Sequence, residues 1–299
     1  MTWLKEQFLS LGNKTAIVDD NETFNYGQLY NQIEEYKCEL DGIFEENQVV
    51  VILSDYNFYS VSLFFALYQK QTIIVPIVSN NKEEVDKRLD VIQPDIVIKL
   101  EGVNYQLTSS KEKFTRHAMI KDLWEKKQPG LVLFSSGSTG EPKAMVHNLE
   151  NLVNSYKGKK QKNLNMLVFL MFDHIGGLNT LLNTLAMGAK IILPSSRNPD
   201  YIANLIEIHK VHVLPASPTF LNMMLIAKAH EKFNLSSLKM ITYGTEPMPE
   251  SLLKKLKTTF RRTKLLQTFG TSETGIAQTS SRSSDSLEMK LEDPKLEYK

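Results

Sequence analysis

The chain has 299 residues, a length typical of about two domains. With 42% hydrophobic and 23% charged residues it has an ordinary globular composition, which excludes a long disordered or fibrous protein. The 35 Lys and Arg residues nearly balance the 34 Asp and Glu residues, so the formal net charge is +1. Charge therefore gives no argument for a nucleic-acid partner or for an anionic membrane surface.

Cysteine usage and hydropathy favour a cytoplasmic protein. The lone cysteine, Cys38, cannot form an intrachain disulfide, and no Cys/His spacing is typical of zinc. Cys38 lies in a helical pattern, which predicts a small core side chain. The most apolar stretch, residues 61–78, is interrupted by polar residues at 69–72, so no membrane-spanning helix is expected. Acidic and basic residues within 1–11 are unlike a signal peptide.

Runs rich in Val, Ile and Leu alternate along the chain with segments of helical periodicity. The runs are mostly continuous, as expected for strands of a sheet that is covered on both faces. Strands are predicted at residues 49–53, 72–78, 95–99, 131–134, 167–170, 190–193, 211–215, 239–243 and 264–268. Helices are predicted at residues 26–40, 58–68, 82–92, 178–187, 218–229 and 250–260. The alternation predicts an α/β fold with mainly parallel sheets covered by helices.

A change of composition suggests how the chain is divided. Residues 109–130 are charged and lack strand signals, which is typical of a boundary. We expect a first α/β subdomain over residues 1–128 and a second over residues 129–279. The remainder, residues 280–299, is rich first in Ser and then in charged residues, and is expected to be an exposed, truncated tail.

The strongest chemical signal is the segment LVLFSSGSTGEPKAMV, residues 131–146. A predicted strand leads directly into a loop of small and hydroxyl residues, and Lys143 follows. The loop residues are Ser135, Ser136, Gly137, Ser138, Thr139 and Gly140. Small residues let backbone N–H groups turn towards an anion, and Lys143 adds a positive charge for phosphate oxygens. The alternative is a flexible Ser/Gly turn that binds no anion.

This loop resembles the signature loop of the adenylate-forming (AMP-binding) superfamily, which includes acyl- and aryl-CoA ligases, peptide-synthetase adenylation domains and luciferases. Further segments resemble family motifs in the family's order. FNYGQL at 24–29 is similar to an early motif, and FDHIGGL at 172–178 to the acyl-pocket motif. ITYGTEPMP at 241–249 resembles the adenine-side loop, and TFGTSETG at 268–275 the aromatic-Gly-x-Thr-Glu motif. The likeness is greatest to acyl-CoA synthetases (fatty-acid–CoA ligases).

The resemblance implies ATP-dependent activation of a carboxylic acid, expected to be a fatty acid, to acyl-AMP with release of pyrophosphate. CoA, or an acyl carrier protein, would then accept the acyl group in the complete enzyme. The implied catalytic residues are Lys143, His174 and Glu273, with Glu273 helping to hold Mg²⁺. Beyond the loop, the residues implied in ATP or AMP binding are Gly244, Thr245, Glu246, Pro247, Thr268, Phe269, Gly270, Thr271 and Ser272.

An acyl pocket is expected around Phe172, Asp173, His174, Gly176 and Gly177. By resemblance, His174 borders the channel where the acid meets the α-phosphate, and the two glycines leave apolar space. Asp173 keeps an alternative open, because amino-acid adenylation domains place an Asp after Phe to bind the substrate ammonium. The alternatives are an amino-acid or aryl adenylation domain that loads a carrier protein, or a non-catalytic ATP-binding remnant.

The resemblance covers only the N-terminal portion of the family. Family members continue with a Tyr-x-Thr-Gly-Asp motif, a hinge Arg and a C-terminal domain that carries a catalytic lysine, none of which is found here. We therefore expect the incomplete large N-terminal domain of an adenylate-forming enzyme. The 299-residue chain by itself is expected to adenylate poorly or not at all.

Overall fold

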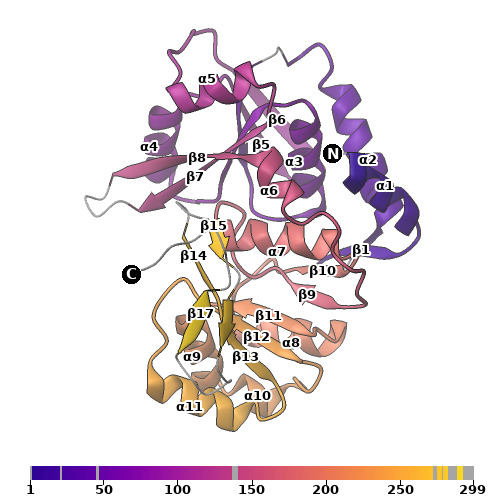
Figure 1. Ribbon diagram of the computed structural model, residues 1–299, viewed down its shortest axis with the longest axis vertical. Helices are drawn as coiled ribbons and strands as arrows, with labels where there is room; N and C mark the ends of the chain where they lie inside the picture. The colour runs from indigo at the N-terminus through magenta and orange to yellow at the C-terminus, as the bar shows by residue number, and fades with distance from the viewer. Residues whose placement is uncertain are drawn as a thin grey trace.

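Two large sheets, each covered by helices on both faces, form the body of the computed structural model (Figure 1). The structure describes residues 2–20, 22–44, 47–136, 141–271, 275–277, 279–281 and 288–291. The predicted α/β class with mainly parallel sheets is confirmed.

The first sheet has six strands in the order β6-β5-β3-β4-β7-β8. Their bounds are β3 Val49–Leu53, β4 Ile73–Ile77, β5 Ile96–Glu101, β6 Asn104–Ser109, β7 Gly130–Ser136 and β8 Pro142–Asn148. The central strands are parallel, whereas β6 and β8 are antiparallel edge strands. In β3, Val49 and Val51 pack into one core cluster and Val50 and Ile52 into another. Burial of both faces explains the continuous apolar run.

The second sheet has seven strands in the order β13-β12-β11-β9-β10-β1-β2. Their bounds are β1 Thr15–Asp19, β2 Glu22–Asn25, β9 Asn165–Leu167, β10 Lys190–Leu193, β11 Val213–Ala216, β12 Met240–Tyr243 and β13 Lys264–Gln267. All neighbours are parallel except β1 and β2. Two small antiparallel ribbons follow: β14 Phe269–Thr271 with β15 Gly275–Ala277, and β16 Thr279–Ser281 with β17 Met289–Leu291.

Helices cover the sheets in layers (Figure 1). The layer between the sheets includes α1 Thr2–Leu11, α2 Tyr26–Glu39, α3 Phe58–Gln69, α6 Leu149–Asn154 and α7 Ile175–Ala186. The outer face of the six-stranded sheet is covered by α4 Lys82–Ile92 and α5 Ala118–Glu125. The outer face of the seven-stranded sheet is covered by α8 Pro199–His209, α9 Pro218–Ile226, α10 Ala229–Lys232 and α11 Glu250–Thr259.

Helix α3 is apolar nearly all round because it lies between the two sheets. Its neighbouring residues Phe64 and Phe65 are both fully buried, as expected for a core helix rather than a surface helix. Asn57 begins the helix: its side chain accepts from the N–H of Ser60, whose hydroxyl accepts from the N–H of Asn57. This reciprocal cap fixes where the chain turns from β3 into α3.

One detail predicted from the sequence, the burial of Cys38, is wrong. Cys38 is exposed, because α2 buries the face of Tyr26, Leu29, Ile33 and Tyr36 instead. The charged segment 109–130 contains α5. Sheet membership does not change at residue 128, since β7 and β8 join the first sheet while β1 and β2 join the second. Of the tail expected at 280–299, only residues 280–281 and 288–291 are described.

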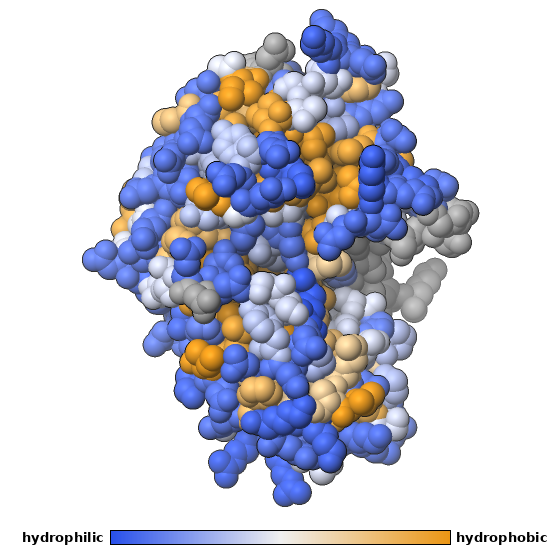
Figure 2. All heavy atoms as spheres, turned by 180° about the vertical axis from the view of Figure 1, so that it is seen from behind, coloured by the Kyte–Doolittle hydropathy of each residue, from blue (hydrophilic) through white to orange (hydrophobic). Residues whose placement is uncertain are grey.

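Apolar side chains gather on the back of the upper half of the molecule, the half built on the six-stranded sheet (Figure 2). A groove of about 930 Å³ lies between α4, α5 and β8, and its apolar lining includes Val91, Ile92, Met119, Ile120, Met145 and Val146. Among the helices that the structure describes, none has both the length and the hydropathy needed to cross a membrane.

Candidate active site

A small cavity of about 70 Å³ lies at the carboxyl ends of β9, β11, β12 and β13. It is lined by Leu170, His174, Ile175, Gly176, Asn179, Thr180, Pro215, Ala216, Thr242, Gly244, Thr245 and Thr268. Because these strands are parallel, the segments that follow them meet at one edge of the sheet. In open α/β sheets this edge is where ligands bind.

The cavity brings together residues of three sequence motifs. His174 and Gly176 come from the expected acyl-pocket motif, Gly244 and Thr245 from the expected adenine-side loop, and Thr268 begins the aromatic-Gly-x-Thr-Glu motif. These segments are far apart in the chain, so only the fold makes them neighbours. The cavity is therefore the candidate active site.

His174 caps the first turn of α7. Its Nδ1 atom accepts the N–H of Gly176 at 3.0 Å. Burial lowers the pKa of His174 below 6.5, and the nearby Asp173 carboxylate opposes this shift only in part. A neutral ring whose Nδ1 is an acceptor carries its proton on Nε2. His174 thus offers one ring N–H donor at the cavity it lines.

Phe172 and Asp173, also expected in the acyl pocket, do not line this cavity. The ring of Phe172 is fully buried, with its centroid 4.5 Å from that of Tyr56. Asp173 points to the other sheet: its Oδ2 accepts from the N–H of Val78 at 3.1 Å and pairs with Arg88 at 2.8 Å. Burial raises the pKa of Asp173, although both of these partners favour its ionised form.

The neighbouring glycines Gly176 and Gly177 have different surroundings. A Cβ atom on Gly177 would lie 2.3 Å from the carbonyl oxygen of Met171 and 2.6 Å from that of Leu170. A Cβ atom on Gly176 would meet the flexible end of the Leu170 side chain, at 2.7 Å. Gly177 lets α7 pack closely against the preceding backbone, whereas Gly176 leaves space in the cavity.

The opposite wall is formed by the segment after β12. A Cβ atom on Gly244 would lie 2.7 Å from the carbonyl oxygen of Thr268, which explains why a glycine fits there. Thr245 has a φ of +71°, a left-handed conformation that is costly for a β-branched residue. The Glu246 carboxylate accepts from the N–H and the hydroxyl of Thr219 at 2.7 and 2.9 Å. Pro247 lies beside Glu246 in a shallow cleft outside the cavity.

Two polar residues that α7 contributes to the cavity, Asn179 and Thr180, were not predicted. The side-chain oxygen of Asn179 accepts from the hydroxyl of Tyr156 at 2.5 Å, and its amide nitrogen has no hydrogen-bond partner among the described residues. Helical periodicity could have predicted them. If Gly176 faces the cavity, the residues three and four positions later lie on the same face of the helix.

The loop expected to bind phosphate is described only at its two ends. Ser135 of β7 and Lys143 of β8 are paired across the hairpin, as are Ser136 and Pro142, and the side chain of Lys143 is exposed. The loop residues between them that lie outside the described residues are Gly137, Ser138, Thr139 and Gly140.

The expected adenine and metal residues beyond Thr268 are described only in part. Phe269, Gly270 and Thr271 form β14, which pairs with β15. Ser272 and Glu273 lie outside the described residues. Within the described part of the chain, no group of three or more His, Cys, Asp or Glu side chains is arranged to hold a metal ion.

Comparison with known families identifies the chain. It matches the AMP-binding enzyme family over residues 4–295. The chain belongs to this family. It is 24% identical over 284 residues to the 2-succinylbenzoate–CoA ligase of Staphylococcus epidermidis, a match that covers 91% of this chain and 58% of the relative. It is 27% identical over 258 residues to the 3,4-dihydroxybenzoate–[aryl-carrier protein] ligase of Bacillus anthracis, covering 83% and 56%. This AMP-binding chain thus spans less than two thirds of these relatives.

Solved structures show the same fold. The N-terminal domain of FACL13 from Mycobacterium tuberculosis superimposes with a TM-score of 0.73 at 18% identity, covering 90% of this chain and 75% of that one. The N-terminal subdomain of Klebsiella oxytoca NpsA, in complex with 3-hydroxyanthranilyl-AMSN, superimposes with a TM-score of 0.73 at 16% identity, covering 92% and 74%. The chain has the fold of the N-terminal subdomain of adenylate-forming enzymes.

Proposed function

We propose that this chain is the ATP- and acid-binding part of an acid–thiol ligase. The observation that supports this proposal most directly is that a single cavity gathers His174 and Gly176 with Gly244, Thr245 and Thr268. An acid bound beside His174 is then adjacent to a nucleotide bound along the segment after β12. That juxtaposition is what adenylate formation requires.

In the proposed first step a carboxylate oxygen bonds to the α-phosphorus of ATP, and the bond to pyrophosphate breaks. In the second step a thiol, of CoA or of a carrier protein, attacks the acyl carbon and AMP leaves. The Nε2–H of His174 orients the carboxylate by a hydrogen bond. Lys143 and the loop that it follows bind the outgoing phosphates. Mg²⁺, held with the help of Glu273, would supply positive charge on the phosphates.

The cavity favours a compact acid with a polar substituent over the long fatty acid that the sequence suggests. A volume of about 70 Å³ is well below the roughly 300–1,000 Å³ of sites for drug-sized ligands. Tyr156 holds the oxygen of Asn179, so the amide N–H groups of Asn179 can donate to a polar substituent of the acid. A hydroxylated aromatic acid comes closer to both conditions than a long fatty acid does. Asp173 is occupied by Arg88 and Val78, which gives no support for an amino acid's ammonium.

Binding of acyl-sulfamoyladenosine analogues tests the proposal, because these analogues resemble the adenylate and need no turnover. We would measure hydroxybenzoyl, benzoyl, hexadecanoyl and phenylalanyl analogues by isothermal titration calorimetry with the purified chain. The hydroxybenzoyl analogue is expected to bind about tenfold more tightly than the benzoyl analogue, the value of one net hydrogen bond.

Two variants separate the hydroxyl contact from general effects on α7. Asn179→Leu is expected to abolish the preference for the hydroxyl group. Asn183→Leu, one turn further along α7 and not part of the cavity lining, is the matched control and should keep it. Tightest binding of the hexadecanoyl or phenylalanyl analogue would overturn the proposed substrate class. Failure of all four analogues to bind would overturn the proposed function and favour a non-catalytic remnant.

A further inference from the structure

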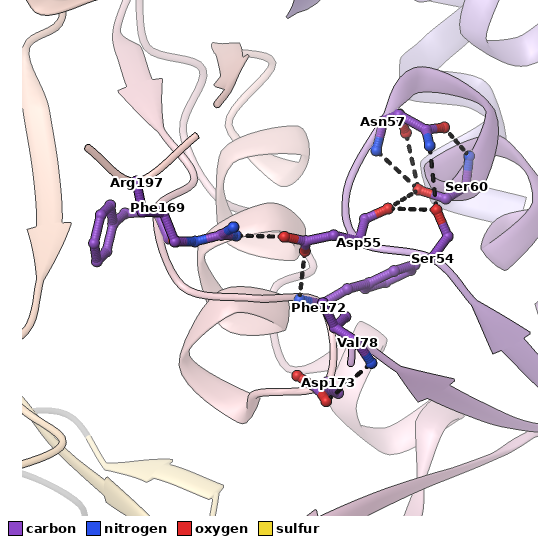
Figure 3. A network of polar contacts seen from close by, with 9 residues as sticks. All are labelled: Ser54, Asp55, Asn57, Ser60, Val78, Phe169, Phe172, Asp173 and Arg197. Carbon is purple, nitrogen blue, oxygen red and sulfur yellow. Dashed lines mark hydrogen bonds and ion pairs between the residues drawn. The ribbon is translucent and has the colours of Figure 1, made fainter. Parts of the chain in front are cut away.

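The segment that leads to His174 is tied to strand ends of both sheets by charged side chains (Figure 3). Asp55, which follows β3, accepts the backbone N–H of Phe172 at 3.1 Å through Oδ1. Its Oδ2 pairs with Arg197, which follows β10, at 2.6 Å. The Nε of Arg197 donates to the carbonyl oxygen of Phe169 at 2.9 Å. Asp55 and Arg197 thus hold this segment at two backbone groups.

A second ion pair holds the same segment one residue before His174. Asp173 accepts from Arg88 of α4 and from the N–H of Val78, which follows β4. The exposed fractions of the Arg88 and Asp173 side chains are only 17% and 8%. The Arg88 guanidinium also lies 5.6 Å from the ring centroid of Phe134, in the strand that enters the phosphate loop. Arg88 therefore contacts both segments that the proposed reaction must align.

Asp55, which follows β3 of the six-stranded sheet, is itself held in place by hydrogen bonds. The carbonyl oxygen of Asp55 accepts the hydroxyls of Ser54 and Ser60, each at 2.9 Å, and Ser60 belongs to the reciprocal cap with Asn57 that begins α3 (Figure 3). Asp55 is therefore attached to the buried layer between the sheets. A displacement of the segment before His174 would have to break charge-assisted hydrogen bonds, which are stronger than neutral ones.

We propose that Asp55, Arg197 and Arg88 are positioning residues: the pairs Asp55–Arg197 and Arg88–Asp173, here called the clamp, fix the backbone of residues 169–174 and so hold the His174 ring against the cavity. A partly buried ion pair adds little net stability compared with apolar packing, but it defines one geometry. Displacements of about 1 Å can lower rates about 10²-fold. The clamp proposal rests on the proposed function in one respect: the proposed function supplies the substrate that His174 orients.

The orientation of His174 is measurable without substrate. We would record the ring nitrogen and proton resonances of ¹⁵N-histidine-labelled protein, which report the tautomer, together with the solvent exchange rate of the Gly176 amide. The wild-type chain is expected to show a single Nε2–H tautomer and a protected Gly176 amide, because that N–H donates to Nδ1 of His174. Asp55→Asn, Arg197→Gln and Arg88→Gln are expected to give mixed tautomers and about tenfold faster Gly176 exchange.

A matched control breaks an ion pair elsewhere. Lys232→Gln removes the pair between Lys232 and Asp200, at 2.8 Å, and should leave the His174 resonances unchanged. If Asp55→Asn or either Gln variant does not fold, Arg197→Lys carries the test. A lysine keeps the charge but lacks the two separate nitrogens with which Arg197 binds Asp55 and Phe169, so this variant should give an intermediate tautomer mixture.

The clamp and the proposed function can fail separately. Clamp variants that lose thermal stability but keep the single tautomer and the protected amide would overturn the clamp, leaving the analogue-binding result intact. Conversely, absence of analogue binding would overturn the proposed function, while mixed tautomers in the clamp variants would still establish that these side chains orient His174.

Discussion

The two walls of the cavity are built in opposite ways. The wall formed by residues 169–177 is fixed by the buried ring of Phe172, by the clamp and by the close packing of Gly177. The wall formed by Gly244 and Thr245 contains a strained backbone, and Thr245 and the two residues that follow it, Glu246 and Pro247, are exposed. A rigid wall can orient a reacting group, whereas an exposed wall can adapt to a ligand. The difference predicts that mutations of the buried or closely packed residues in the first wall cost stability and that mutations of the exposed residues in the second wall cost little.

The largest loss is expected on removing the ring of Phe172. Phe172 is fully buried between Tyr56 and Phe64, with ring centroids 4.5 and 5.5 Å away. Phe172→Ala should lower the free energy of unfolding by about 4 kcal/mol, measured by urea denaturation. Phe172→Leu, which keeps part of the volume, should lose clearly less. A loss below about 1 kcal/mol for the alanine variant would contradict the rigidity of this wall.

The adjacent glycines provide a second comparison within the same wall. Gly177→Ala brings a methyl group against two backbone carbonyls and should cost about 3 kcal/mol. Gly176→Ala meets side chains and no backbone, namely the end of Leu170 at 2.7 Å and the His174 ring at 3.1 Å, and a gain of about 1 kcal/mol in helix propensity offsets these contacts. Gly176→Ala should therefore fold normally but bind adenylate analogues more weakly. Equal melting temperatures for the two variants would contradict this assignment.

In the exposed wall, relief of strain should be stabilising. Thr245→Gly removes the Cβ atom that makes a φ of +71° unfavourable, and should raise the free energy of unfolding by up to about 1 kcal/mol. Thr245→Ala is the control: alanine keeps a Cβ atom and should gain little. The measurement is urea denaturation of both variants. A stabilisation by alanine as large as that by glycine would mean that the backbone is not the cause.

The smallest effect is a pH dependence from His174. Burial lowers its pKa below 6.5 in the folded chain, so its stabilising contribution is present above about pH 6.5 and is lost as the pH falls through the folded pKa. His174→Gln should therefore lose less stability than the wild type between about pH 6.5 and pH 5. His209 and His212, whose pKa values burial also lowers, remain in both proteins. Parallel stability curves would show that His174 is not buried as described.

Much of the architecture follows from local sequence. The runs predicted as strands at 49–53 and 190–193 correspond to β3 and β10 with unchanged bounds, because strands covered on both faces have nearly continuous apolar sequences. Helix α8 was missed, although Asn198 caps it and Pro199 begins it. The strands predicted on either side of it, at 190–193 and 211–215, run parallel in one sheet, and parallel strands need a crossover connection such as a helix. An Asn followed by a Pro is a typical start of a helix, and this pair at 198–199 would have predicted α8.

The motifs of the candidate site could be predicted from the sequence, but the arrangement of their side chains in space could not. The sequence by itself determined the family, and it predicted residue types for phosphate, adenine and acid, since these depend on backbone freedom, hydroxyls and charge in short segments. Only the tertiary structure decided that Asp173 pairs with Arg88 and that Asn179 lines the cavity. The partners of a side chain at a strand end come from other strands distant in the chain, and the packing of the two sheets selects which of them meet.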